Sequence, residues 1–163
     1  DCFSSLMSSH RAEILPVDFP NTAAARITID APASRIFDLL ASPAAHQRFD
    51  GSGTVRNVIS GPERLYLGAT FGMAMKIKVP YRIKNTVVEF EENKKITWCH
   101  LMKWTWCYEL QSISATQTIV TESFDASKVP AFSKWWLKRT GALAHNPKFM
   151  AKSLVALKAI CEA

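Results

Sequence analysis

The amino-acid sequence predicts an α+β domain in which a curved antiparallel β-sheet wraps around a long C-terminal α-helix. Three observations support this prediction. Six strand-like segments follow one another between residues 55 and 124 with short turns between them, a spacing typical of an antiparallel meander. Residues 147–162 carry apolar side chains at i, i+3 and i+4 spacing, as an amphipathic helix does. Residues 126–163 contain seven Lys or Arg and one acidic residue, Glu162, so this segment carries the whole net charge of +6.

The domain is expected at residues 23–163, after an N-terminal extension at residues 1–22. The extension is rich in Ser and Pro, and we expect at most one helical turn in it, around Arg11–Leu15. Ala24–Asp30 predicts the first strand, with alternate Ile side chains on one face.

Two short helices are expected next, followed by the six strands. Pro32 suits a first helical turn, and the apolar spacing that follows extends this helix to about Leu40. A second short helix is expected from Pro43 to Gln47, ending before Gly51. The strands are expected at Val55–Ser60, Thr70–Val79, Tyr81–Glu91, Lys95–Leu101, Trp104–Gln111 and Thr116–Phe124.

The final helix has a start signal at Asn146 and Pro147, a good N-cap followed by a good first helical residue. Its apolar face should pack on the sheet, with three lysines away from the centre of that face, at Lys148, Lys152 and Lys158. The segment Val129–Ala144, between the last strand and this helix, is expected to form a mobile rim.

This order of elements resembles the helix-grip fold of the START/Bet v 1-like superfamily, and specifically its polyketide cyclase/dehydrase-like branch. The resemblance covers about residues 24–162 and departs from the family at Gln117, where a Gly is usual before the last strand. It rests on these segments: Ile29–Ala33 with Ile36 and Phe37, Lys95–Trp98, Trp106–Leu110, Thr118–Asp125 and Asn146–Lys158. It implies a mostly apolar pocket between the sheet and the helix.

In the family's register, one face of the last hairpin points inward, and period-2 alternation makes that face largely apolar. These side chains either form an ordinary core or line the pocket. The expected ligand-binding residues are Trp98, His100, Trp106, Tyr108, Val120, Glu122 and Phe124 from the sheet, with Phe149, Met150 and Leu154 from the helix.

Glu122 is the most informative of these residues, because a carboxylate on an apolar face must be paired, hydrated or protonated. Burial would raise its pKa and make it a proton donor or an anchor for a ligand. The alternative is a structural role, at the open end of the sheet or paired with Arg82 or Lys84. His100 and Tyr108 are further candidates for acid–base chemistry, and a structural imidazole is the alternative for His100.

Several kinds of site are not expected. The sequence has no CxxC pair, no GxSxG elbow and no phosphate-binding glycine loop, and its four His lack metal-ligand spacing, so no metal and no cofactor are predicted. Cys99 and Cys107 are expected as free thiols, neighbours on the outer face. A reduced, cytoplasmic setting is therefore expected.

The basic segment after residue 126 combines Lys134, Lys138 and Arg139 with Trp135 and Trp136. It is either a solvated face or a weak contact site for anionic membranes; no recognised motif points to nucleic acid. A monomer or a homodimer is expected.

Three functions fit the sequence, and we rank first the function that requires the fewest specifically placed residues. The first is binding or transport of a hydrophobic small molecule, such as a lipid or a polyketide-like compound. The second is a polyketide cyclase/dehydrase-type enzyme. The third is a membrane-docking module that binds lipid or quinone. The sequence does not decide whether the protein is an enzyme, because function resides in the site and not in the fold.

Overall fold

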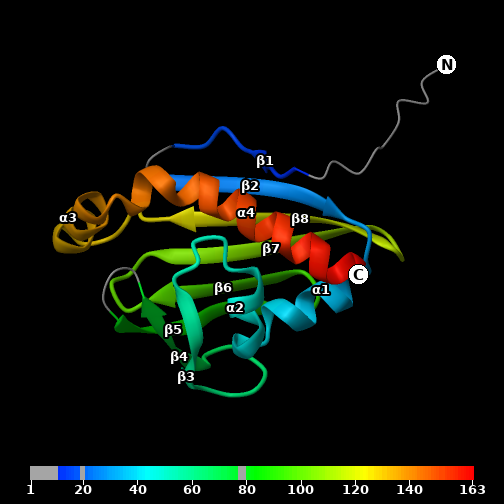
Figure 1. The fold of residues 1–163 in the computed structure, drawn as a ribbon, viewed down its shortest axis with the longest axis horizontal. Coiled ribbons are helices and arrows are strands. Elements are labelled where there is room, and N and C mark those ends of the chain that lie inside the picture. The colour runs from blue at the N-terminus through cyan, green and yellow to red at the C-terminus, as the bar shows by residue number, and fades with distance from the viewer. Residues whose placement is uncertain (1–10, 19–20, 77–79) are drawn as a thin grey trace.

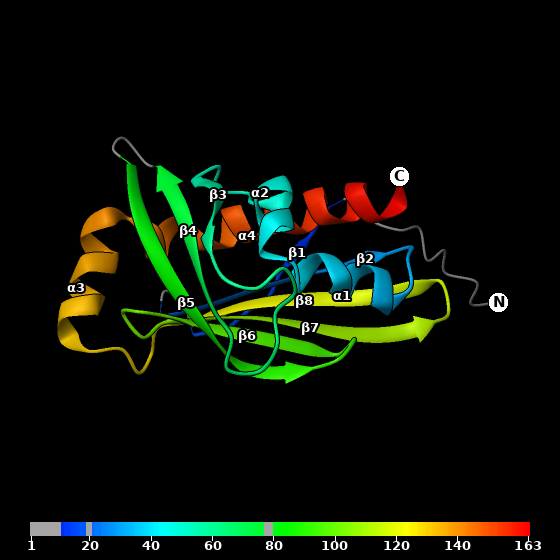
Figure 2. The same ribbon diagram turned by 90° about the horizontal axis from the view of Figure 1, so that it is seen from below.

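The computed structural model describes residues 11–18, 21–76 and 80–163. In this part of the chain, eight strands form one antiparallel sheet in the order β1-β2-β8-β7-β6-β5-β4-β3. The strands are β1 (Glu13–Ile14), β2 (Thr22–Ile29), β3 (Val55–Ser60), β4 (Thr70–Lys76), β5 (Pro80–Glu91), β6 (Lys95–His100), β7 (Thr105–Ser114) and β8 (Gln117–Asp125). The sheet is strongly twisted and curved (Figures 1 and 2).

The helices are α1 (Ala33–Leu40), the 3₁₀ turn η1 (Pro43–Ala45), α2 (His46–Phe49), α3 (Ala131–Thr140) and α4 (Ala142–Glu162). Figure 2 shows α1, α2 and α4 on the same face of the sheet, while α3 lies beyond one end of it. This is the helix-grip arrangement that the order of sequence elements predicts.

The predicted strands from β2 to β8 are present, with ends that differ by a few residues. Two expectations concern residues outside the described part of the chain. They are the N-terminal extension over residues 1–10, with Cys2, and the last residues, 77–79, of the strand expected at Thr70–Val79. The helical turn expected around Arg11–Leu15 is wrong. Glu13 and Ile14 form a short strand that pairs with Arg26 and Ala25 of β2.

The segment Val129–Ala144 differs most from expectation, because it forms α3 and the first residues of α4. Gly141 separates the two helices with φ +73°, a left-handed conformation that glycine adopts readily. The helix α4 therefore begins at Ala142, before the predicted N-cap Asn146 and the predicted first helical residue Pro147. Pro147 lies inside the helix, and Asn146 is buried in it and is no N-cap.

Lys158 was expected at the margin of α4, and this is also wrong. The residue is 4% exposed. Its Nζ atom donates a hydrogen bond to the Thr28 carbonyl oxygen at 2.9 Å and forms an ion pair with Glu162. The charge is thus buried only because both partners compensate for the lost water. The hydrogen bond to Thr28 fixes the C-terminal end of α4 to β2.

The long helix covers one side of the sheet rather than its middle. It packs mainly on β2, with β8 and α2 beside it, and Figure 1 shows it crossing these strands. The small buried side chains of Ala23 and Ala25 lie on β2 and allow a close approach. The middle of the sheet is left to α1 and α2.

Gly51, just after α2, lies in close contact with the backbone of α4. A Cβ atom there would collide with the Phe149 carbonyl oxygen and lie 2.6 Å from the Ser153 nitrogen. The Gly51 N–H donates a hydrogen bond of 2.7 Å to the Ser153 hydroxyl oxygen. This contact holds α2 beside α4, and so over the concave face.

The expected register of the last hairpin is confirmed. The strands pair Trp106 with Phe124 and Tyr108 with Glu122, and the inward face is buried along β8. On β5, a bulge at Val88 leaves Val87 inside, opposite Trp98. Cys99 and Cys107 are free thiols, as expected, but they are diagonal neighbours because Cys107 pairs with Thr97.

Candidate ligand-binding site

Aromatic rings from the sheet and from α2 meet on the concave face. The ring centroids of Trp98 and Tyr108, neighbours across β6 and β7, lie 5.7 Å apart. His46 of α2 stacks on Trp98 at 5.0 Å, and Phe49 meets the Tyr108 ring edge-on at 6.5 Å. We call His46, Phe49, Trp98, Tyr108 and Glu122 the inner cluster.

Glu122 is the acidic member of the inner cluster. It is 4% exposed and lies between Ala25 of β2 and Tyr108 of β7. Burial raises the pKa of its carboxyl group to about 8; a hydrogen bond from Tyr108 lowers the pKa, and the negative charge of Asp50 raises it. At neutral pH the group is therefore mostly a carboxylic acid, which can both donate and accept a hydrogen bond.

The second oxygen of Glu122, Oε2, is buried and has no hydrogen-bond partner in the described part of the chain. A buried polar atom without a partner costs roughly 1–3 kcal/mol. Four other buried side-chain atoms share this property, on Asn85, Asn93, Thr97 and Asn146. Glu122 differs from them because it can be charged and lies within the aromatic cluster.

The two other titratable members of the cluster are neutral. Burial raises the pKa of the Tyr108 hydroxyl well above 10, and the nearby Glu122 raises it further. Burial lowers the pKa of His46, although a hydrogen bond of its Nε2 to the Leu40 carbonyl oxygen, 2.9 Å long, opposes this effect. Since a carbonyl only accepts, Nε2 carries the proton and Nδ1 is the acceptor.

His100, expected in the pocket, is held in the turn between β6 and β7. Its ring stacks on Trp104 with centroids 4.0 Å apart, and its Nδ1 accepts a hydrogen bond of 3.0 Å from the Met102 N–H. Burial lowers the pKa of His100 to about 4. The structure does not bring His100 into contact with the inner cluster by any interaction among the described residues.

The remaining predicted residues fall into three groups. Trp106 and Phe124 form a separate ring pair, 4.7 Å apart, at the end of the sheet where the chain leaves for α3. Met150 and Leu154 are fully buried on α4, and Val120 is buried on β8 beside Glu122. Phe149 is only partly buried, and its ring lies against His145, 5.9 Å away.

The sequence reasoning missed His46, Phe49 and Asp50. The spacing of His46 and Phe49, three residues apart on a short helix, places both on one face and was the available signal. Their partners are about 50 residues away in the chain, so no local pattern could identify the contact with Trp98 and Tyr108.

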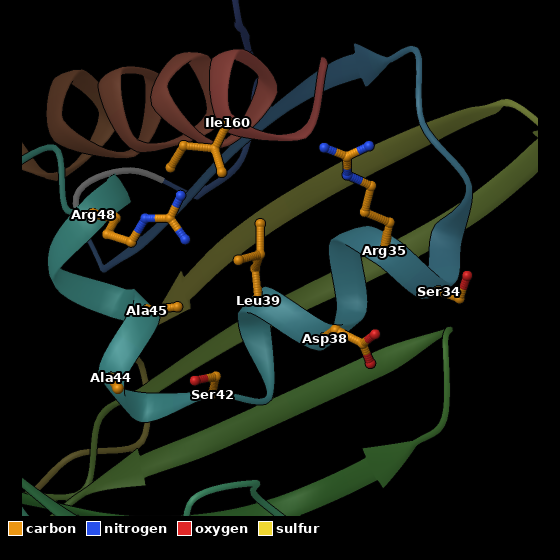
Figure 3. A pocket seen from close by; sticks show the side chains of 9 residues that line it. All are labelled: Ser34, Arg35, Asp38, Leu39, Ser42, Ala44, Ala45, Arg48 and Ile160. Carbon is orange, nitrogen blue, oxygen red and sulfur yellow. The ribbon is translucent and has the colours of Figure 1, made fainter. Parts of the chain in front are cut away.

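Among the hollows on the surface of the described residues are two that the inner cluster does not line. The first has a volume of about 750 Å³ and lies between α1, α2 and the C-terminal part of α4. Figure 3 shows Arg35 reaching into it from α1 and Arg48 from α2, with Leu39 and Ile160 between them. Its positive charge differs from the apolar pocket that the sequence predicts.

The second hollow, about 810 Å³, lies at the far end of the sheet, between the start of α1 and the β7–β8 hairpin. Charged and polar residues of the sheet, Glu91, Lys94, Lys95 and Glu109, form much of its wall. The rings of the inner cluster contact one another, so a ligand that enters between them must displace side chains.

The described residues contain neither a metal-ligand cluster nor a membrane-spanning helix. No three His, Cys, Asp or Glu side chains in this part of the chain gather closely enough to hold a metal ion. No helix in the same residues is both long and apolar enough to cross a bilayer.

Two curated relatives share part of the sequence. The uncharacterized protein Rv0088 of Mycobacterium tuberculosis strain H37Rv is 38% identical over 107 residues, which are 65% of this chain and 48% of that protein. The uncharacterized protein MT0096 of Mycobacterium tuberculosis strain CDC 1551 is 37% identical over 107 residues, which are again 65% of this chain and 48% of that protein. The matched region thus spans about half the length of these relatives. No family model matches the chain.

Solved structures extend the comparison to nearly the whole chain. Protein Ms6760 of Mycobacterium smegmatis superposes with a TM-score of 0.68 at 12% identity, covering 92% of this chain and 96% of that one. A protein from Arthrobacter aurescens gives 0.69 at 10% identity, covering 92% and 91%.

The Polyketide_cyc-like protein Cgl2372 of Corynebacterium glutamicum gives a TM-score of 0.61 at 18% identity, covering 86% of this chain and 91% of that chain. At such identities the likeness concerns the fold alone. The curved eight-stranded sheet, the two short helices and the long helix α4 therefore give this chain the helix-grip fold, which it shares with these solved structures.

Proposed function

We propose that the protein binds a hydrophobic small molecule of lipid or polyketide-like type on the concave face of its sheet, with Glu122 as the polar anchor. The observation that carries the proposal is the buried Oε2 atom of Glu122, which lies beside Tyr108 and has no hydrogen-bond partner in the described part of the chain. A ligand with a carbonyl, hydroxyl or ether oxygen would supply the missing partner. Its apolar part would gain from contact with the rings.

The protonation of Glu122 decides which ligands suit the site. With a pKa near 8, the acid donates a hydrogen bond at neutral pH without placing a charge among apolar groups. Tyr108, directly across from Glu122 on β7, lowers the pKa of the carboxyl group and so partly offsets the effect of burial. The anchor therefore favours neutral ligands over anionic ones, because an anionic group would be repelled by the negative charge of Asp50 and would lose its hydration among apolar groups.

Trp106 suggests the route into the site. It is partly buried and packs on the fully buried Phe124, at the end of β7 and β8 from which the chain continues to α3. A change of rotamer at Trp106 would open a path along β8 toward Glu122, two residues before Phe124 on the same face.

Binding is tested with an apolar fluorescent probe and with native mass spectrometry of the protein purified from its own host. We expect a co-purifying apolar molecule, and probe binding that weakens at least severalfold in Trp98→Ala. The matched control is Trp136→Ala, which removes an exposed Trp from α3 and should bind the probe as the wild type does. Absence of both a co-purifying molecule and probe binding would contradict the proposal.

A catalytic role is the second candidate, and the pKa of Glu122 favours it. A carboxylic acid with a pKa near neutrality can donate a proton in a dehydration or cyclisation and take it back afterwards. Incubation with polyketide-like β-keto compounds, followed by mass spectrometry, separates the two functions. A product that requires Glu122 supports catalysis; an unchanged compound that binds supports binding alone.

A further inference from the structure

The helix α3 has two apolar faces, only one of which is covered. Ser133 and Leu137, four residues apart, are buried and turn toward the domain. Phe132, Trp135 and Trp136 are spaced as one helix stripe and are exposed by 67%, 53% and 45%. Three large aromatic side chains on one exposed stripe are unusual for a surface that faces only water.

The exposed aromatic stripe is accompanied by positive charge alone. Lys134, Lys138 and Arg139 lie within α3, and the helix contains no acidic residue. Phe132 stacks on Trp135 with centroids 6.1 Å apart, and the Arg139 guanidinium lies 5.6 Å from the centre of the Trp135 ring. The stripe is thus an ordered surface with its cations beside it.

The position of α3 leaves the stripe accessible. Figures 1 and 2 both show α3 beyond one end of the sheet, where it contacts the N-terminal part of α4. Thr105 of β7 pairs with Asp125 of β8, so the β6–β7 turn lies at the same end. That turn adds another exposed apolar side chain, Leu101, and another cation, Lys103.

We propose that α3 docks the protein on anionic lipid bilayers, with Phe132, Trp135 and Trp136 in the interface and the three cations beside the headgroups. Trp and Phe suit the boundary between headgroups and acyl chains, and Lys and Arg reach the phosphates from there. Each basic residue near the surface strengthens binding about fivefold. The proposal does not rest on the ligand site, since Glu122 takes no part in it.

Co-sedimentation of the full chain with vesicles tests the proposal, using phosphatidylcholine alone or mixed with phosphatidylserine, at low and high salt. We expect binding to the mixed vesicles that salt weakens, and much weaker binding to phosphatidylcholine. Trp135→Ala with Trp136→Ala should reduce binding at least tenfold. Replacing Lys134, Lys138 and Arg139 together by Gln should reduce it about a hundredfold.

A matched control replaces Tyr66 and Leu67 by Ala, because both are exposed apolar residues in the loop before β4. This variant and Glu122→Gln should bind vesicles as the wild type does. Circular dichroism confirms that each variant is folded. The proposal is overturned by equal or absent binding to both vesicle types, by a control that loses as much as the Trp variant, or by self-association through the stripe without vesicle binding.

Discussion

Glu122 of β8 lies directly across from Tyr108 of β7, and the interaction of the two side chains raises the pKa of the Tyr108 hydroxyl and lowers the pKa of the Glu122 carboxyl group. Both side chains are buried. The pair therefore places one acidic proton and one phenolic proton side by side on an apolar face. Their protonation states differ from those of exposed residues, and this difference can be measured.

The stability of the protein should depend on the protonation of Glu122. The native state holds this proton up to a pKa of about 8, whereas the unfolded chain releases it near 4.5. Protonated Glu122 therefore stabilises the native state, and this stabilisation is fully present below pH 4.5. As the pH rises from 4.5 toward 8, the free energy of unfolding falls by about 1.4 kcal/mol per pH unit. Urea unfolding from pH 5 to 9 should show this fall, and Glu122→Gln should remove it.

The comparison with the Gln variant has its own control. At pH 5 both proteins carry a neutral side chain at position 122, so their free energies of unfolding should be similar. At pH 8 or above, Glu122→Gln should be the more stable protein. Parallel curves for the two proteins across this range would mean that Glu122 has an ordinary pKa.

Gly51→Ala should destabilise the protein by about 1–3 kcal/mol or more, because the new methyl group would collide with the backbone of α4 at Phe149 and Ser153. Thermal or urea unfolding measures the loss. Gly53→Ala is the control: its Cβ meets open space, but its φ of +68° costs roughly 1 kcal/mol. If Gly53→Ala lost more stability than Gly51→Ala, the close contact of Gly51 with α4 would be contradicted.

Lys158→Met should destabilise the protein by about 1–3 kcal/mol, because it removes a charged hydrogen bond to Thr28 and the ion pair with Glu162. Hydrogen exchange should rise in the last turns of α4. Lys152→Met, an exposed position on the same helix, should change stability by less than about 0.5 kcal/mol. If both variants lost equally little stability, Lys158 would have to lie at the surface.

The ring stack in the β6–β7 turn should keep His100 neutral to unusually low pH. Its pKa of about 4 is caused by burial, much of it under Trp104. In an NMR titration, Trp104→Ala should bring the pKa of His100 back toward 6.5. His46, which does not touch Trp104 in any described contact, should keep its own titration unchanged.

The strands and their inward faces could be predicted because alternation has a fixed period of two. Once Tyr108 and Glu122 are paired, the positions of Phe124 and Trp106 follow. The sequence placed Glu122 on this face but left open whether the residue is buried or lies at the open end of the sheet. The two-residue strand at Glu13 could not be predicted, because two residues carry no pattern.

The helices after β8 were harder to predict for physical reasons. The apolar residues Phe132, Trp135 and Trp136 turn away from the core, so α3 shows little of the periodicity that marks a buried face. Pro147 was taken as a helix start, although the turn at Gly141 supplies the actual boundary. The stacking of His46 on Trp98 depends on tertiary packing, which cannot be predicted from the spacing of residues in the sequence.

The pH dependence of ligand affinity tests the central claim most directly. We expect a neutral apolar ligand with one carbonyl oxygen to bind through protonated Glu122, so its affinity for the wild type should fall about tenfold between pH 7 and 9, given a pKa of about 8. Isothermal titration calorimetry of the wild type and of Glu122→Gln makes the comparison. The account predicts a flat pH profile for Glu122→Gln; the same profile in both proteins would contradict it.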